Sequence, residues 1–152
     1  MTSVSDPVIS ESGTAFSPVL AALHASAFEG AARWSESAFT ELLATPGARA
    51  FLASVQAEPV GFILIRAVLD EAEILTLAVS PEWRRRGIAR KLLETVEHAL
   101  KKEQITKLFL EVSTKNTSAE ALYTKAGFVK AGTRKRYYED GSDAVVMVRD
   151  MS

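Results

Sequence analysis

The sequence predicts one α/β domain, residues 1–152, with a mixed β-sheet. Two apolar runs, Ala50 to Val55 and Val60 to Leu69, flank the turn-forming residues 56–59 and predict an antiparallel hairpin. Downstream, strand and helix patterns alternate as strand-helix-strand-helix-strand. This alternation after an antiparallel start is typical of a mixed sheet with flanking helices.

Composition excludes several classes of protein. With 47% hydrophobic and 24% charged residues, the chain is neither disordered nor fibrous. Eighteen basic residues against 19 acidic ones give a net charge of -1, which argues against nucleic-acid and membrane partners. The absence of cysteine excludes disulfides and thiolate metal sites. Since neither a signal peptide nor a long apolar run is recognisable, we expect a cytoplasmic protein.

The first part of the chain predicts two short helices ahead of the hairpin. Residues 1–12 are expected to be a loose lead-in with a short strand around Val8. Helical spacing of apolar residues begins at Pro18 and continues to Ala27. Ser35 opens a second helix through Leu43, which Pro46-Gly47 ends.

The middle of the chain predicts strand, helix and strand. Glu73 to Val79 has a strand pattern, and Ser80-Pro81 ends it because proline lacks the amide donor of the ladder. Apolar residues at three-to-four spacing predict a helix from Ile88 to Lys102. Lys107 to Ser113 alternates as a strand does.

The last part predicts a helix followed by two strands. Thr117 to Glu120 fits a capping box, and Gly127 suits the left-handed residue that ends a helix. Phe128 to Tyr138 and Ala144 to Val148 are expected to be strands joined by a hairpin turn at residues 139–142.

A basic, glycine-containing turn between a strand and a helix is the most informative stretch. The first amides of a helix lack internal partners and lie at the positive end of its dipole, so they bind phosphate groups well. Gly87 and Ala89 are small enough to let a phosphate approach the backbone. The cations that accompany them are Arg84, Arg85, Arg86, Arg90 and Lys91. The plainer interpretation is a basic turn that happens to begin a helix.

Several motifs in order resemble the GNAT superfamily of N-acetyltransferases, from about Ala50 to the end of the chain. The run from Arg84 to Ala89 resembles its acetyl-CoA signature, with alanine at 89 where glycine is commoner. Further along the chain, the second half of the family's pattern is similar to Leu110-Glu111-Val112, Asn116, Ala119, Leu122-Tyr123 and Gly127-Phe128. One branch of the family acetylates the N-terminal alanine of ribosomal proteins. The chain resembles this branch at Arg134, Tyr137-Tyr138, Asp143-Ala144 and Met147.

This resemblance implies a largely antiparallel central sheet with a splayed strand pair that holds acetyl-CoA. In the family, an amine attacks the thioester directly within a ternary complex, without a metal. The strand around Ala78 would offer backbone groups to the pantetheine arm and the thioester oxygen. The coenzyme-binding residues implied are Leu77, Ala78, Val79, Arg84, Arg85, Arg86, Gly87, Ile88, Ala89, Arg90 and Asn116.

The resemblance also implies catalytic roles for Glu111 as general base and Tyr123 as general acid. These roles suit the chemistry, since the amine must lose a proton and the departing thiolate must receive one. Glu73 is a rival base. Taken alone, Glu111 fits a solvated strand residue and Tyr123 a packed one. Asn116 fits a helix cap as well as a coenzyme contact.

The expected acceptor is the N-terminal amine of a protein, with a ribosomal protein that begins with alanine as the leading candidate. An α-amine with a pKa near 8 is more often neutral at pH 7 than a lysine amine. Ser113 and Lys115 stand where the branch usually has arginine and serine, and Tyr137 and Tyr138 fit either a peptide entrance or cross-strand packing.

Two other functions stay open: acetylation of a small amine such as a polyamine or an aminoglycoside, and non-catalytic binding of acyl-CoA. A metal site is not expected, because His24 and His98 are isolated and cysteine is absent.

Overall fold

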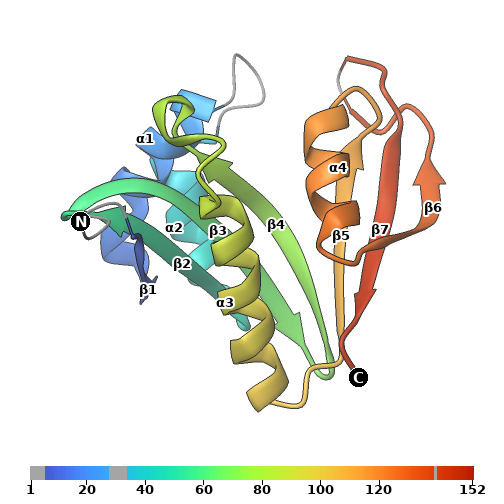
Figure 1. The fold of residues 1–152 in the computed structure, drawn as a ribbon, viewed down its shortest axis with the longest axis horizontal. Coiled ribbons are helices and arrows are strands. Elements are labelled where there is room, and N and C mark those ends of the chain that lie inside the picture. Colours follow the sequence, from blue (N-terminus) through green and yellow to red (C-terminus); the bar gives the residue numbers. More distant parts are fainter. Residues whose placement is uncertain (1–5, 28–33, 139) are drawn as a thin grey trace. The chain divides into compact units, whose positions relative to one another are not determined.

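The computed structural model of the chain describes residues 6–27, 34–138 and 140–152 (Figure 1). Its strands are β1 (Val8–Ser12), β2 (Ala48–Val55), β3 (Glu58–Val68), β4 (Glu71–Val79), β5 (Lys107–Ser113), β6 (Val129–Arg134) and β7 (Ala144–Asp150). Its helices are α1 (Ser17–Ala27), α2 (Glu36–Leu43), α3 (Ile88–Lys102) and α4 (Thr117–Lys125), with 3-10 turns η1 (Thr14–Phe16) and η3 (Pro81–Trp83).

The described strands follow one another in the order β1-β2-β3-β4-β5-β7-β6, so the expected mixed sheet is confirmed. The chain divides into two compact units. The first comprises Met1–Arg66 and Leu75–Val96, and the second comprises Ala67–Ile74 and Glu97–Ser152. Strand β4 therefore begins in the second unit and ends in the first.

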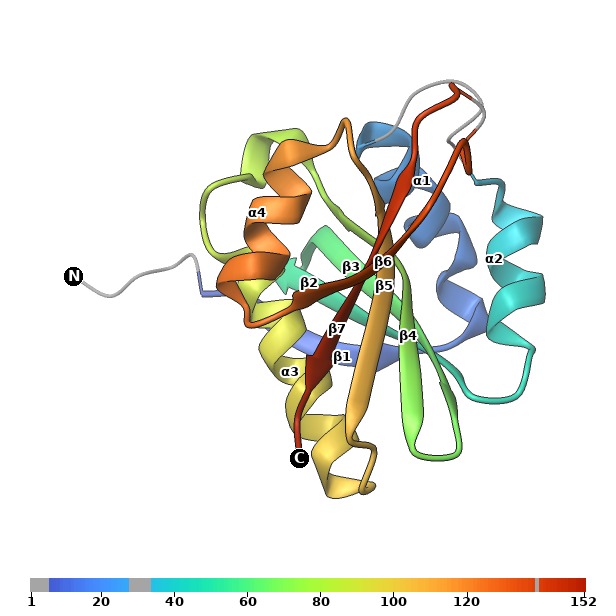
Figure 2. The same cartoon turned by 90° about the vertical axis from the view of Figure 1, so that its right-hand side faces the viewer.

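The first unit is an antiparallel sheet with helices on both faces. β1 pairs with β2, and β2 pairs with β3, over nearly their whole lengths. The apolar faces of α1 and α2 pack against β2 and β3 around Leu20, Phe39 and Phe62, all fully buried. The beginning of α3 covers the opposite face, and β3 is buried on both sides (Figure 2). The predicted α1 and α2 are confirmed, and Ser35 caps α2 by accepting the Ala38 amide at 3.1 Å.

The second unit is built on β5, which has a strand on each side. Glu71–Glu73 pairs in parallel with Lys107–Phe109, and β7 pairs antiparallel along the whole of β5. β6 is the exposed edge strand on β7. Helix α4 ends as predicted at Gly127, whose φ is +100°.

Three sequence-based expectations need correction. Residues 8–12 are no loose lead-in, because they form β1 and pair with β2; the short strand around Val8 is confirmed. The α4 N-cap is Asn116, whose Oδ1 accepts the Ala119 amide at 3.1 Å, so the capping box at Thr117 is wrong. The strand expected to reach Tyr138 ends at Arg134, which pairs with Ala144, and residues 135–138 and 140–143 lie in a longer connection between the two strands. Residue 139 of the expected turn lies outside the described residues.

Burial of a histidine makes the first unit sensitive to acid. Imidazole Nδ1 of His24 accepts the Trp34 amide at 3.2 Å, and the ring stacks on Trp34 with centroids 5.0 Å apart. Its side chain is buried, and this burial lowers the pKa of His24 to about 4. In the unfolded chain the pKa lies near 6.5. Between these values the unfolded state binds the proton and the folded state does not, so stability falls as the pH drops.

We therefore expect His24→Asn to flatten the acid limb of the stability curve. Asparagine keeps an acceptor for the Trp34 amide but cannot take up a proton. Between pH 6.5 and 4 the wild-type protein should lose about 1 kcal/mol more per pH unit than the variant. Denaturant unfolding at several pH values measures this difference. The exposed His98→Asn is the control, and an equal slope in wild type and His24→Asn contradicts the prediction.

Candidate active site

The basic turn between β4 and α3 has the backbone form expected of an anion site. Arg85 and Gly87 both have left-handed φ angles, +62° and +78°. The Gly87 carbonyl accepts the Lys91 amide at 3.0 Å, which is the first bond of the α3 ladder. The preceding amides of Ile88 and Ala89 therefore have no partner four residues earlier within the helix and lie at its positive end. Such an arrangement suits a pyrophosphate.

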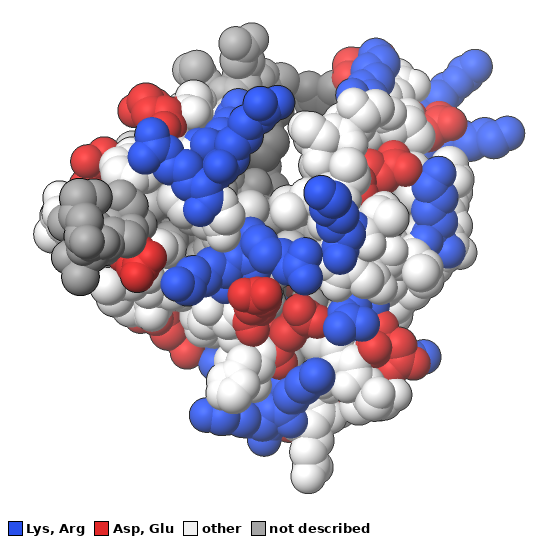
Figure 3. Space-filling view, in the orientation of Figure 1, with Lys and Arg blue, Asp and Glu red and all other residues white. Residues whose placement is uncertain are grey.

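Arginine side chains surround this turn at the surface. Figure 3 shows Lys and Arg gathered over the turn that precedes α3. Nε of Arg84 donates to the Val79 carbonyl at 3.4 Å, and the Arg86 guanidinium lies 4.8 Å from the centre of the Trp83 ring. Nε of Arg90 lies 3.5 Å from Oε2 of Glu94, one turn further along α3. Because these cations are exposed, they can neutralise phosphate charge without first being desolvated.

The end of β4 is held tightly against β3 by a glycine. A Cβ placed on Gly61 would lie 2.9 Å from the Ala78 carbonyl oxygen and 3.3 Å from a Val79 methyl. Ala78 is buried, whereas Leu77 and Val79 on the other face of the strand are half-buried. The Ser80 amide donates to the Val60 carbonyl at 2.8 Å, which ends the strand beside β3. Gly61 thus fixes the position of the backbone at Leu77–Val79.

In the second unit, Glu111 is a carboxylate with two different oxygens. It lies on β5 opposite Val146 of β7, and its side chain is 16% exposed. Oε1 lies 3.1 Å from Nε of Arg134, on β6. Oε2 is buried and has no hydrogen-bond partner among the described residues. Glu111 is therefore not a solvated strand residue, and one of its oxygens is able to accept a proton.

Tyr123 is positioned by the way in which α4 ends. The Phe128 amide donates to the Tyr123 carbonyl, and the Gly127 amide to the Thr124 carbonyl, at 3.0 and 3.1 Å. These two bonds form a Schellman motif, in which residues on either side of the glycine make an apolar contact. Here that contact is between the rings of Tyr123 and Phe128, with centroids 5.5 Å apart. Burial, and secondly the charge of Tyr138, raise the pKa of Tyr123, so its phenol stays protonated.

Tyr138 links the two predicted catalytic residues through electrostatics. Burial, followed by the charges of Glu111, Tyr137 and Asp140, raises the pKa of Tyr138 to about 12. Tyr138 in turn raises the pKa of Tyr123. The second unit therefore brings Glu111, Tyr138 and Tyr123 within electrostatic reach of one another. Tyr138 lies outside β6, so the cross-strand interpretation of this residue is wrong.

The rival base shares a face of the sheet with Glu111. Glu73 pairs with Phe109, two residues before Glu111, and residues two apart on a strand point to the same side. Asn116 uses its side-chain oxygen for the helix cap, accepting from the Ala119 amide at 3.1 Å and the Ser118 hydroxyl at 3.2 Å. Its side-chain NH₂ carries the donors that a coenzyme contact would use.

Sequence reasoning missed the ion pair of Arg134 and the hydrogen bonds among Ser113, Asp140 and Ser142. The ion pair could not be predicted without the order of the strands, because Arg134 on β6 reaches Glu111 on β5 across the intervening strand β7. Within the described ranges, no three metal-ligating side chains gather, and no helix has the length and apolar character of a membrane span.

Comparison with known proteins finds one family and close relatives. The model of the acetyltransferase (GNAT) family matches residues 18–128. The [ribosomal protein bS18]-alanine N-acetyltransferase of Escherichia coli K12 is 36% identical over 124 residues, covering 78% of this chain and 82% of that protein. An N-alpha-acetyltransferase of Saccharolobus solfataricus is 34% identical, covering 74% and 75%. The crystal structure of the Escherichia coli ribosomal-protein-S18-alanine N-acetyltransferase superposes with a TM-score of 0.89 at 32% identity, covering 97% and 95% of the chains.

The close approach at Gly61 generates a test of the β4 backbone. In Gly61→Ala the new methyl meets the Ala78 carbonyl, so β3 and β4 must separate. We expect a loss of about 1–3 kcal/mol of unfolding free energy, the usual range for overpacking, and weaker acetyl-CoA binding. The matched control is Gly132→Ala, because a Cβ there meets nothing within 4 Å. Denaturant unfolding and calorimetric titration measure both effects, and equal behaviour of the two variants argues against the constraint.

Proposed function

The chain belongs to the acetyltransferase (GNAT) family, and on that basis we propose that it transfers the acetyl group of acetyl-CoA to the N-terminal amine of a protein. The proposed acceptor is a ribosomal protein that begins with alanine. The observation that carries this choice is the 36% identity to the bS18-alanine enzyme over most of both chains. The proposal treats residues 1–152 as one catalytic domain that acts in the cytoplasm.

The first unit supplies the proposed coenzyme-binding surface. The amides at the start of α3 face a pyrophosphate, and the exposed arginines neutralise the remaining phosphate charge. The backbone of Leu77–Val79, fixed by Gly61, offers groups to the pantetheine arm. An amide on this strand is suited to hydrogen-bond the oxyanion that forms when the thioester is attacked. No metal has a role in this arrangement.

Glu111 is the proposed group that takes the proton from the acceptor amine. An α-ammonium with a pKa near 8 must become neutral before it attacks the thioester carbon. The buried Oε2 of Glu111 has no protein partner and is open to that proton or to an intervening water. The ion pair of Oε1 with Arg134 holds the carboxylate in place.

Tyr123 is the proposed donor to the departing sulfur of the coenzyme. When the tetrahedral intermediate collapses, the carbon–sulfur bond breaks and the thiolate becomes negative. Because its pKa is raised, Tyr123 is a weaker acid than a free phenol. It therefore stabilises the thiolate by donating a hydrogen bond, and complete proton transfer is less favourable than the sequence alone suggests.

The acceptor is tested by thiol release from acetyl-CoA together with intact-mass measurement. We expect one acetyl group on peptides that begin with alanine. We expect none on the same peptides with blocked N-termini and an internal lysine, and none on polyamines. Turnover confined to lysine or polyamines would place the substrate elsewhere within the family. Coenzyme binding without thiol release for any acceptor would contradict the enzymatic proposal.

The role of Tyr123 is tested by removing one oxygen atom. Tyr123→Phe keeps the ring contact with Phe128 but loses the donor, so kcat should fall about 10²-fold, the usual scale for losing a hydrogen-bond donor to developing negative charge. Acetyl-CoA affinity should be retained. Thr124→Val is the matched control, since it removes an exposed hydroxyl from the next position of α4. Unchanged kcat in Tyr123→Phe would remove this residue from the mechanism.

A further inference from the structure

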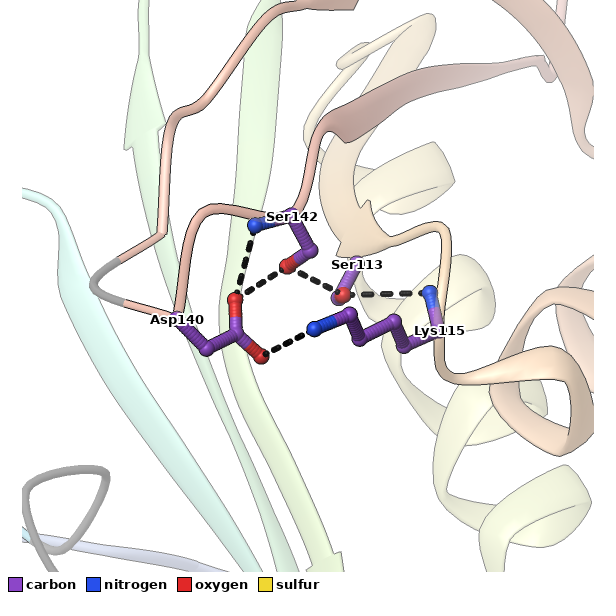
Figure 4. Close-up of polar contacts among 4 residues, drawn as sticks. All are labelled: Ser113, Lys115, Asp140 and Ser142. Atoms are coloured by element: carbon purple, nitrogen blue, oxygen red, sulfur yellow. Dashed lines mark hydrogen bonds and ion pairs between the residues drawn. The ribbon is translucent and has the colours of Figure 1, made fainter.

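We propose that Ser113, Lys115, Asp140 and Ser142 form a ring of hydrogen bonds, closed by one ion pair, that positions the loop of residues 135–138 and 140–143 for binding of the acceptor (Figure 4). We call these four residues the polar ring. They are positioning residues, because none of them is proposed to touch the reacting atoms. The inference about the acceptor rests on the proposed function.

The polar ring is closed, and the direction of each hydrogen bond follows from the donors available. The Ser142 amide and hydroxyl both donate to Oδ1 of Asp140, at 2.9 and 2.6 Å. A serine has a single hydroxyl proton, so the 2.8 Å contact between Ser113 and Ser142 is donated by Ser113. The Lys115 amide donates to the Ser113 oxygen at 3.2 Å, and its Nζ lies 3.6 Å from Oδ2 of Asp140.

The serine contacts contribute more to the ring than the ion pair does. The side chains of Lys115 and Asp140 are 64% and 57% exposed, and exposed pairs of this kind contribute little. Ser142, in contrast, is only 5% exposed. Removal of its hydroxyl would leave the Ser113 hydroxyl without its partner in a half-buried position.

The loop needs such a restraint because it lies beyond the strand ladder. β6 ends at Arg134 and β7 begins at Ala144, so the described residues between them, 135–138 and 140–143, lack regular strand pairing. Inside the loop, the Tyr138 amide donates to the Ser142 carbonyl and the Gly141 amide to the Tyr138 carbonyl, at 3.2 and 2.9 Å. Ser142 is therefore bonded both to Tyr138 and, through Ser113, to the end of β5.

The ring thereby connects the loop to the proposed catalytic residues. Ser113 lies two residues after Glu111 on β5, and Tyr138 is close enough to Glu111 and Asp140 for both charges to raise its pKa. Tyr137, half exposed, packs edge-on against Tyr138 with ring centroids 5.1 Å apart. Release of the ring would let Tyr138 move away from Glu111, together with Tyr137, which packs on it.

The ring depends on this chain's own residues. Position 113 must be short and must both accept the Lys115 amide and donate to Ser142. An arginine at position 113 would have donors but no acceptor, so it could not take part in this way. Ser113 and Lys115 thus have a structural role in the ring.

The chain contains a matched control for the local part of the ring. At the end of β7, the Ser152 amide and hydroxyl donate to Oδ1 of Asp150 at 3.0 and 2.6 Å, the same two bonds that Ser142 makes. We therefore compare Ser142→Ala with Ser152→Ala, and Asp140→Ala with Asp150→Ala. Each pair removes the same local bonds, but only the first member of each pair removes a bond of the ring.

We expect Ser142→Ala and Asp140→Ala to raise KM for an alanine-starting peptide about tenfold, with KM for acetyl-CoA changed less than twofold and kcat less than threefold. The control variants should match the wild-type protein. An unchanged peptide KM, or an equal rise in both KM values, would overturn the proposal.

Hydrogen exchange separates this inference from the proposed function, because it needs no acceptor. We expect the amides of Tyr138 and Gly141 to exchange at least tenfold faster in Ser142→Ala than in wild type or Ser152→Ala. Equal exchange would overturn the ring even if peptides are acetylated. If no peptide is acetylated but exchange is faster in Ser142→Ala, the restraint on the loop is supported and only the proposed acceptor is contradicted.

Discussion

The parallel pairing of β4 with β5 is the constraint on which the rest of the structure depends. Parallel neighbours cannot be joined by a tight hairpin and need a crossover of a dozen or more residues, usually a helix. Helix α3 supplies this crossover, so a helix N-terminus necessarily follows the end of β4. The same connection places β5, and with it Glu111, directly after the helix. The positions of the basic turn and of the proposed base are both consequences of one pairing.

The second unit combines one carboxylate with two phenols, and this combination limits the electrostatic cost of burial. Arg134 offsets the charge of Glu111, whereas burial keeps Tyr123 and Tyr138 neutral. Neutral phenols can be buried because they need only hydrogen-bond partners and carry no charge that must be desolvated. A site of this kind combines a carboxylate with two phenols that remain hydrogen-bond donors at neutral pH.

The sequence predicts most elements of the fold, since local signals determine them. Apolar spacing located α1 and α3, Ser35 and Gly127 marked helix ends, and Pro81 ended β4. The cap at Asn116 is a local error of one residue, whereas the other two errors lie where distant segments decide the outcome. β1 exists because β2 offers it a partner, and β6 ends where its pairing with β7 ends. For the site, the resemblance named Glu111 and Tyr123, but their surroundings required the order of the strands.

The two Asp-x-Ser segments of the chain show why such surroundings escape sequence reasoning. Asp140-Gly141-Ser142 and Asp150-Met151-Ser152 form the same local hydrogen bonds, with nearly the same distances. Only the first serine also contacts a third residue, Ser113, from a segment 29 positions away. The local motif therefore supplies a carboxylate that accepts two hydrogen bonds from the serine. Whether the motif also restrains a loop depends on the fold around it. The polar ring arises because the pairing of β5 with β7 brings Ser113 opposite Ala144, two residues after Ser142.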